Sequence, residues 1–244
     1  MSMIFTKEQI AQMKFDRTPN KVLVKPTRGT NEVILSGGVK IYMDNRFGKE
    51  KHAPTTGIII AHCGKLIPAR MLWENTNEIQ TGDYAIYSYE SAIYAMDEMH
   101  GRLIFDEDGD VYFLIDYEDL FVVKRNDQVI PVNGYLLVSP LGEKSSSAFT
   151  ISKEDNNSAR YGTIEYIGTR NTQYIAAGKN RDDVFDFEEN ISQGDIIIFS
   201  RDSDLPLEYN LHRSLSDRSK LFFRLQRKDI DGIITPEEKN KFGL

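Results

Sequence analysis

The stretch that decides the fold is TGDYAIYS at residues 81–88, because a close copy of it, QGDIIIFS, returns at residues 193–200. In each copy a Gly-Asp pair stands directly before an apolar run of β-branched and aromatic residues, which favour strands. One such match can arise by chance. It indicates a duplicated domain only if the flanking sequence repeats as well.

Three more pairs of segments repeat in the same order and at nearly the same spacing. They are 21–26 with 135–140, 57–60 with 162–165, and 111–122 with 221–232. Four ordered matches are hard to explain except by duplication. We therefore expect two domains of ordinary small size, each able to bury a modest core of its own.

The repeat also sets the expected domain boundaries. These are an N-terminal extension at 1–19, a first domain at 20–125, a second domain at 130–235 and a C-terminal tail at 236–244. The connecting segment 124–128 is short and polar, which predicts that the two halves lie close together rather than on a long tether.

The composition of the 244 residues is that of an ordinary globular protein, with 40% hydrophobic and 27% charged residues. The net charge of −7 argues against a nucleic-acid backbone or an anionic membrane surface as partner, since both favour a basic face. The single cysteine, Cys63, excludes an intrachain disulfide and suggests a reducing compartment. We expect no signal peptide and no membrane span. A cytoplasmic location is expected, with an organelle or the cytoplasm of a phage-infected host left open.

Short runs rich in Val, Ile, Tyr and Phe, broken by Gly, Asn and Asp, dominate the chain and are typical of strands in a barrel or sandwich. A short helix is expected within 3–15 with Thr6 as its N-cap, and a hairpin turn at 107–110. The expected strands are 21–25, 32–36, 38–43, 57–62, 84–89, 92–96, 102–105, 111–115, 120–124, 134–139, 148–152, 162–168, 195–200, 220–226 and 231–234.

Two long segments in each half are unlike strands. The first runs over 29–56 and has its counterpart at 141–161, and the second runs over 63–80 with its counterpart at 169–193. Loops of this length inside a compact domain are usually functional or disordered. We therefore expect any interaction sites to lie in these segments.

Catalytic and cofactor signatures are missing from the sequence. The four histidines are scattered, and no His, Cys, Asp or Glu group has metal-ligand spacing. No glycine pattern predicts a phosphate loop or a dinucleotide site. The run Asp229-Ile230-Asp231-Gly232 begins like a calcium loop without its later ligands. Acidic clusters such as 106–108 are interpreted as solvated turns. We expect no enzyme activity, no metal and no cofactor.

The order of elements in the first repeat resembles that of the GroES-like co-chaperonins, the ten-kilodalton lids of type I chaperonins. A strand ends in Lys-Pro at 25–26, a loop carries Gly-Gly and alternating apolar residues at 37–42, and a strand opens with Thr-Gly at 56–57. The Gly-Asp strand and two acidic strands complete the pattern at 82–87 and 109–123. The resemblance covers both halves and implies two tandem, mostly β, small-barrel domains.

In that family a mobile loop of each subunit enters an apolar groove on the chaperonin, and the subunits form a seven-membered dome over an unfolded client. The resemblance implies a homo-oligomeric ring, a GroEL-like type I chaperonin as partner, and two binding loops. The first loop is Gly37, Gly38, Val39, Lys40, Ile41 and Tyr42, and the second is Ala148, Phe149, Thr150 and Ile151.

In an extended segment alternate side chains share a face, so Val39 and Ile41 can enter a groove while Lys40 stays in water. The second loop departs from the family, because three serines at 145–147 replace Gly-Gly. Val39 and Ile41 can alternatively belong to an edge strand packed on the barrel, and the second loop can be an inert insertion. The segments 65–80 and 170–192 correspond to the family's roof hairpin.

Tyr89 lies near the family's cavity-facing aromatic residue, and its alternative interpretation is a half-exposed strand residue.

The sequence leaves two candidate functions. The first is a co-chaperonin lid, with ATP spent by its partner. The second is a divergent structural or assembly protein, possible for a phage or mobile element, that kept the fold and lost the lid role. An enzyme or an oligonucleotide-binding barrel is disfavoured by the missing ligands and the acidic charge.

Overall fold

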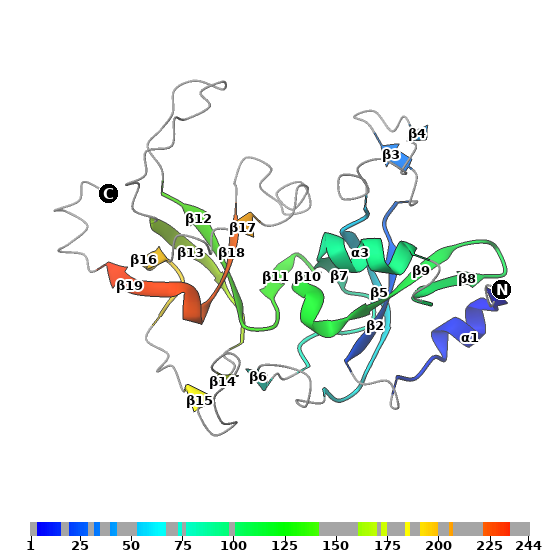
Figure 1. The fold of residues 1–244 in the computed structure, drawn as a ribbon, viewed down its shortest axis with the longest axis horizontal. Coiled ribbons are helices and arrows are strands. Elements are labelled where there is room, and N and C mark those ends of the chain that lie inside the picture. Colours follow the sequence, from blue (N-terminus) through cyan, green and yellow to red (C-terminus); the bar gives the residue numbers. More distant parts are fainter. Residues whose placement is uncertain are drawn as a thin grey trace.

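The computed structural model of the chain describes a mostly β protein, which confirms the expected fold class at that level (Figure 1). The residues that it describes are 4–15, 20–28, 32–34, 40–42, 53–66, 73–74, 77–97, 101–141, 161–169, 172–174, 184–185, 191–199, 205–206 and 222–234.

The largest sheet has the strand order β1-β8-β9-β2-β5-β7-β10-β11, antiparallel except for the parallel pair β1–β8. Its strands are β1 (Ile4–Phe5), β2 (Lys21–Pro26), β5 (Thr56–His62), β7 (Tyr84–Tyr87), β8 (Leu103–Asp106), β9 (Val111–Asp116), β10 (Leu120–Arg125) and β11 (Gln128–Pro131). The second sheet has the order β17-β18-β12-β13-β16-β19. Its strands are β12 (Tyr135–Pro140), β13 (Tyr161–Ile167), β16 (Ile196–Phe199), β17 (Leu205–Pro206), β18 (Phe223–Gln226) and β19 (Ile230–Ile234).

The two large sheets share one strand order, β9-β2-β5-β7-β10 in the first and β18-β12-β13-β16-β19 in the second. Pro26 lies opposite Gly57, and Pro140 lies opposite Gly162 in the same way. The ladder shifts register directly after Leu23 in the first sheet and at the corresponding place in the second. A one-turn 3₁₀ helix precedes the last of these strands in both sheets, at Tyr117–Asp119 and Arg227–Asp229.

The Gly-Asp motif forms the turn before β7 and before β16. Gly82 and Gly194 both have φ of +93°, a conformation that favours glycine. The Asp83 carboxylate accepts a hydrogen bond from the Gln80 N–H at 2.8 Å, and Asp195 accepts one from the Ser192 N–H at 2.7 Å. The repeated sequence motif is therefore a repeated turn with the same internal hydrogen bonds.

Each large sheet buries one apolar face in its own core. Val22, Val24 and Phe113 belong to the first core, and Val138 and Leu225 belong to the second. Strand pairing among the described residues leaves β1 and β11 at the two ends of the first sheet, and does not close either sheet into a barrel. The closed small barrel and the GroES-like identity of each half therefore stay predictions.

The N-terminal helix α1 (Lys7–Ala11) lies where the sequence predicts it. The Thr6 hydroxyl accepts from the Gln9 N–H at 3.1 Å, while the Gln9 side chain accepts from the Thr6 N–H at 2.9 Å. This reciprocal pair is a capping box, which stabilises a short helix. Ile10 is the buried residue of this helix and joins the first core.

The expected strand 92–96, and the end of the expected strand 84–89, are wrong. Residues Tyr89–Met96 form helix α3, which packs against β9. The Ser88 hydroxyl accepts from the Glu90 N–H at 3.2 Å and caps the helix. Ala92 and Ala95 are fully buried, and alanine is the strongest helix former. The expected strand 148–152 lies outside the described residues.

The polar segment 124–128, expected as the linker, is the turn of the β10–β11 hairpin, with positive φ at Asn126 and Asp127. The chain enters β12 through a second tight turn at Asn133 and Gly134, which have φ of 57° and 72°. Two positive φ values in succession are typical of type I′ turns, which match the twist of paired strands.

Candidate functional site

The first predicted binding loop contains a two-stranded hairpin that is separate from the large sheets. Its strands are β3 (Glu32–Ile34) and β4 (Lys40–Tyr42), with Ile34 opposite Lys40. Among the described residues these strands pair only with each other. Figure 1 shows the hairpin standing off the first large sheet, beyond α3. The backbone of Lys40, Ile41 and Tyr42 is therefore extended, as expected.

The rest of the two predicted loops lies outside the described residues. This holds for Gly37, Gly38 and Val39 at the tip of the first loop. It holds also for the four residues of the second loop, Ala148, Phe149, Thr150 and Ile151. Their assignment to a chaperonin-binding surface stays a prediction.

The two segments expected as roof hairpins pair with each other across the halves. Strand β6 (Trp73–Glu74) of the first half pairs with β14 (Thr172–Tyr174) of the second, and β14 pairs with β15 (Val184–Phe185). In Figure 1 this three-stranded sheet and the β3–β4 hairpin lie on opposite edges of the molecule. One edge therefore carries the candidate binding hairpin and the other carries a sheet to which both halves contribute.

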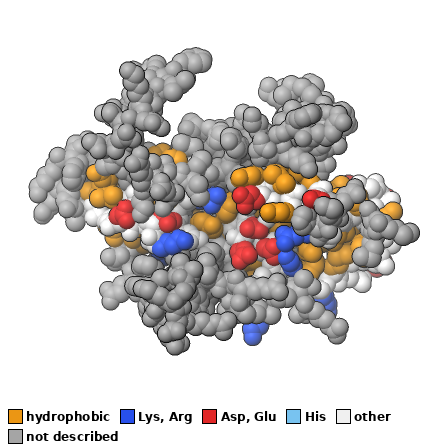
Figure 2. All heavy atoms as spheres, viewed as in Figure 1, with side chains coloured by type: hydrophobic (Ala, Val, Ile, Leu, Met, Phe, Trp, Pro, Cys, Tyr) orange, Lys and Arg blue, Asp and Glu red, His pale blue; other side chains and the backbone are white. Residues whose placement is uncertain are grey.

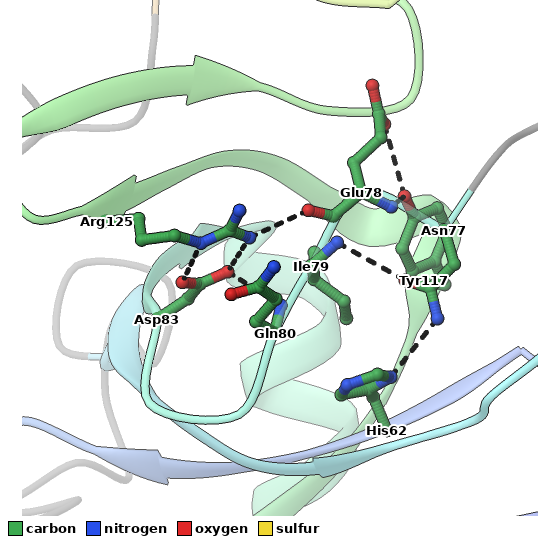
Figure 3. A network of polar contacts seen from close by, with 8 residues as sticks. All are labelled: His62, Asn77, Glu78, Ile79, Gln80, Asp83, Tyr117 and Arg125. Atoms are coloured by element: carbon green, nitrogen blue, oxygen red, sulfur yellow. Dashed lines mark hydrogen bonds and ion pairs between the residues drawn. The ribbon is translucent and has the colours of Figure 1, made fainter.

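A polar network around Glu78, Asp83, Tyr117 and Arg125 in the first half (Figure 3) continues to Asn133 and Thr169 at the second. Its central group is the Glu78 carboxylate. Oε2 accepts hydrogen bonds from the Asn133 N–H at 2.9 Å and from the Tyr117 hydroxyl at 3.2 Å. Oε1 accepts one from the Thr169 N–H at 3.2 Å. One side chain therefore ties the segment before β7 to one end of the antiparallel β12–β13 pair, where β12 begins and β13 ends.

Arg125 anchors the same segment from β10. Its Nε and Nη2 each lie 2.8 Å from an oxygen of the Asp83 carboxylate, and Nη2 also donates to the Glu78 carbonyl at 2.9 Å. Asp83 is only 2% exposed, and a two-pronged guanidinium contact compensates the burial of its charge. The Gly-Asp motif thus holds the network in place as well as forming the turn.

A pocket of about 340 Å³ lies where the two halves meet. The Arg224 guanidinium lies over the Phe121 ring, with 4.0 Å from its carbon to the ring centroid, and 6.0 Å from the Tyr135 centroid. Figure 2 shows acidic side chains close to basic ones near the middle of the molecule. The pocket is lined by Ser88, Tyr89, Glu90, Glu118, Asp119, Phe121, Tyr135 and Arg224.

Asp119 is the most buried carboxylate of this pocket. Burial raises its pKa above the ordinary value, although a hydrogen bond from the Ser91 hydroxyl opposes the rise. Tyr89 lines the pocket as the first residue of α3 and is half-buried. The interpretation of Tyr89 as a strand residue is therefore wrong. Whether it faces an enclosed client stays a prediction.

Sequence reasoning missed Glu78 and Arg224, two charged side chains that make contacts across the junction of the halves. A lone glutamate in a long polar segment and a lone arginine in a strand carry no pattern that separates them from surface charges. Asp106 was interpreted as part of a solvated turn, but its side chain accepts from the Tyr112 hydroxyl at 3.0 Å and is 2% exposed. That interpretation is wrong for Asp106.

Among the described residues, no group of three or more His, Cys, Asp or Glu side chains is arranged to hold a metal ion. No helix in the described part of the chain is long and apolar enough to cross a membrane. Comparison of the chain with models of known protein families gives no match, and comparison with curated proteins gives none either.

Proposed function

We propose that this protein is a tandem co-chaperonin, built from two GroES-like repeats, that caps a type I chaperonin ring and helps to enclose an unfolded client. The β3–β4 hairpin and the loop between β12 and β13 bind the chaperonin. The three-stranded sheet β15-β14-β6 forms part of the roof. The protein acts without a cofactor, because the partner hydrolyses ATP, and several chains assemble into a ring.

The main support for the proposal is that the β3–β4 hairpin and the three-stranded sheet lie on opposite edges of the molecule (Figure 1). A lid must bind the ring with one edge and close the cage with the other. The hairpin lies on one edge of the molecule, and strands from both halves pair on the opposite edge (Figure 1). This is the arrangement that a lid needs.

The shared strand order of the two sheets gives independent support. Equivalent strands, register shifts and Gly-Asp turns recur in both halves, as duplication of one ancestral domain would produce. A repeated domain brings a repeated binding loop. The large polar insertion of the second half falls between β12 and β13, at the same place in the strand order as the β3–β4 hairpin between β2 and β5.

Weak single loops explain why two repeats are joined. Burying two apolar side chains such as Val39 and Ile41 gains roughly 1.5–3 kcal/mol each. Ordering a flexible loop costs about 1–2 kcal/mol per residue in backbone entropy. The gain of one loop is largely offset, so useful affinity requires several loops on one assembly. Two repeats in one chain keep a second loop at high effective concentration.

The test is binding to the type I chaperonin of the same cell, measured with and without ATP. Val39→Asp/Ile41→Asp and Phe149→Asp/Ile151→Asp are compared with the wild type. We expect ATP-dependent binding that weakens at least about 100-fold in the first double variant, because about 3 kcal/mol of apolar burial is lost. The second double variant reports whether the second loop contributes.

The matched control is Tyr94→Asp, which places one carboxylate on a side chain that is 50% exposed on α3 and belongs to neither predicted loop. It should bind as the wild type does. Equal weakening by Tyr94→Asp would mean that the loops are not the binding surface. A folded wild type that binds no chaperonin favours the divergent assembly protein instead.

A further inference from the structure

The pocket at the junction is built from both halves of the chain. Phe121 of β10 and Tyr135, the first residue of β12, supply aromatic walls, and Arg224 comes from β18. Ser88 and Tyr89 line the pocket where α3 begins. Ligand pockets occur preferentially between packed units, and they measure roughly 300–1,000 Å³. The volume of about 340 Å³ found here lies within that range.

The pocket already holds one cation against its aromatic walls. Among the described residues, Arg224 is the one basic side chain of the lining. Its guanidinium lies over the Phe121 ring and forms a hydrogen bond with the Tyr135 side chain. The face of an aromatic ring attracts a cation because it carries negative charge density. The arrangement shows which kind of group this lining accommodates.

Negative charge is nevertheless in excess among the lining side chains that the structure describes. Three carboxylates, those of Glu90, Glu118 and Asp119, accompany the single guanidinium, which gives a formal net charge of −2. Glu90 and Glu118 are exposed, whereas Asp119 is half-buried. Two of the three acids are therefore open to a partner from outside.

The surroundings of Asp119 indicate the same shortage of positive charge. Burial raises the pKa of this carboxyl group, and the nearby Asp116 raises it further. The Ser91 hydroxyl, Arg102 and Lys21 oppose the rise in pKa without cancelling it. The charged form of Asp119 is thus incompletely compensated, and a cation that entered the pocket would stabilise it.

Other classes of ligand fit this lining less well. A phosphate or carboxylate bound to Arg224 would lie among three acidic side chains, and like charges repel strongly where water is excluded. An apolar ligand would remove water from those carboxylates without replacing its hydrogen bonds, which is costly. A Lys or Arg side chain supplies a cation together with an apolar stem that can pack on the aromatic walls.

The acidic surface continues beyond the pocket along α3. Glu90 lies in the first turn of this helix, and Tyr94, four residues later and so on the same face, is 50% exposed. Asp97 follows at the C-cap, and α3 itself contains no basic residue. A free amine would use the pocket alone. An extended polypeptide that carries a basic side chain can use the pocket and this outer face of α3 together.

We propose that the pocket and the outer face of α3 bind a basic segment of a partner protein, with an Arg or Lys side chain inserted beside Glu90, Glu118 and Asp119. Charge complementarity selects the partner, and the aromatic walls hold the stem of the inserted side chain. Because the lining comes from both halves, the bound segment also holds the halves together. The inference goes beyond the proposed function, since it uses no residue of the two predicted chaperonin-binding loops.

The test is fluorescence anisotropy of a short, labelled and capped peptide in which arginine alternates with glycine. The comparison peptide carries citrulline, an uncharged analogue of arginine. We expect the full-length wild type to bind the arginine peptide about tenfold more tightly than the citrulline peptide, the factor that one hydrogen bond between charged groups supplies.

Two double variants locate the site. Glu90→Gln/Glu118→Gln should weaken binding of the arginine peptide about fivefold, because it removes two exposed carboxylates of the lining. Glu8→Gln/Glu107→Gln removes the same charge from exposed residues of α1 and of the β8–β9 turn, and should bind as the wild type does. All four side chains are exposed, and far-UV circular dichroism verifies that both variants are folded.

Equal binding of the two peptides, or no binding of the arginine peptide to the folded wild type, would overturn the proposal. Equal weakening by the two double variants would also overturn it, because the overall acidity of the protein would then account for the binding. Spermidine and N-acetyl-arginine amide serve as free cations. If either binds as tightly as the peptide, the occupant is a small cation and not a partner segment. None of these measurements involves a chaperonin.

Discussion

The Glu78 carboxylate accepts a hydrogen bond from the backbone N–H of Asn133, with 2.9 Å between Oε2 and N. Asn133 is fully buried at the turn that leads into β12, and its side chain donates to the carbonyls of Tyr117 and Leu120 at 2.6 and 2.8 Å. A side chain of the first half therefore holds the turn that begins the second. The orientation of the two halves is fixed by directional contacts as well as by apolar packing.

Replacing Glu78 by Gln should loosen this junction. The carboxylate accepts from Asn133, Tyr117 and Thr169, whereas an amide offers one acceptor oxygen and turns two N–H groups toward these donors. Hydrogen bonds to a charged group contribute about 1.5–3 kcal/mol each when buried. We expect the free energy of unfolding, measured in urea, to fall by about 1–3 kcal/mol.

The control for this variant is Glu107→Gln, which makes the same chemical change at an exposed residue of the turn between β8 and β9. Its unfolding free energy should stay within about 0.5 kcal/mol of the wild type. Equal effects of the two substitutions would contradict a special role for Glu78.

Gly57 should tolerate no side chain. A Cβ there would lie 2.3 Å from Val24 Cγ1 and 2.6 Å from the Lys25 carbonyl oxygen, so the β2–β5 pair would have to separate. Overpacking of this kind costs about 1–3 kcal/mol. Gly57→Ala should lower the thermal midpoint, whereas Gly64→Ala, where a Cβ meets nothing within 4 Å, should not. A wild-type midpoint for Gly57→Ala would contradict the close approach of β2 and β5.

The stability contributed by Asp106 should depend on pH. Burial alone raises its pKa. Hydrogen bonds from the Asp110 N–H, the Tyr112 hydroxyl and the Asp108 N–H outweigh burial and hold the pKa below its ordinary value of 3.8. Because the folded pKa is lowered, the contribution is present above the unfolded pKa. It is lost as the pH falls through the folded pKa.

Thermal unfolding of wild type and Asp106→Asn over a pH series measures this contribution. The Asp106 carboxylate accepts from the turn N–H groups through one oxygen and from the Tyr112 hydroxyl through the other. The amide of Asn has one oxygen, so it cannot accept both sets of hydrogen bonds. We expect the wild type to have the higher midpoint at neutral pH and the gap to close below about pH 4. A gap that is constant across the series would contradict the hydrogen-bonded carboxylate.

Most strands could be predicted from the sequence, because the same apolar runs recur in the same order in both halves. The Gly-Asp turn is the clearest case, since the positive φ of its glycine and the hydrogen bond to its carboxylate follow from the residue types. The turn into the second half also has a sequence signal, because Asn133-Gly134 is typical of a type I′ turn. The linker was expected at 124–128 because that segment is more polar.

Other features depend on contacts that sequence does not show. Ile93 and Tyr94 favour a strand by propensity, yet Ser88 caps a helix here and buried alanines pack it on β9. The pairing of β6 with β14 joins segments from different halves, and each strand is too short to carry a pattern. Glu78 and Arg224 act across the junction, which only the arrangement of the two halves creates.

The most direct test of the central claim is co-elution of the wild-type protein with the type I chaperonin of the same cell, with ATP and without nucleotide. A lid should co-elute only when ATP is present, and Val39→Asp/Ile41→Asp should abolish the complex while Tyr94→Asp leaves it intact. Failure of the folded wild type to form the complex with ATP would contradict the proposed function.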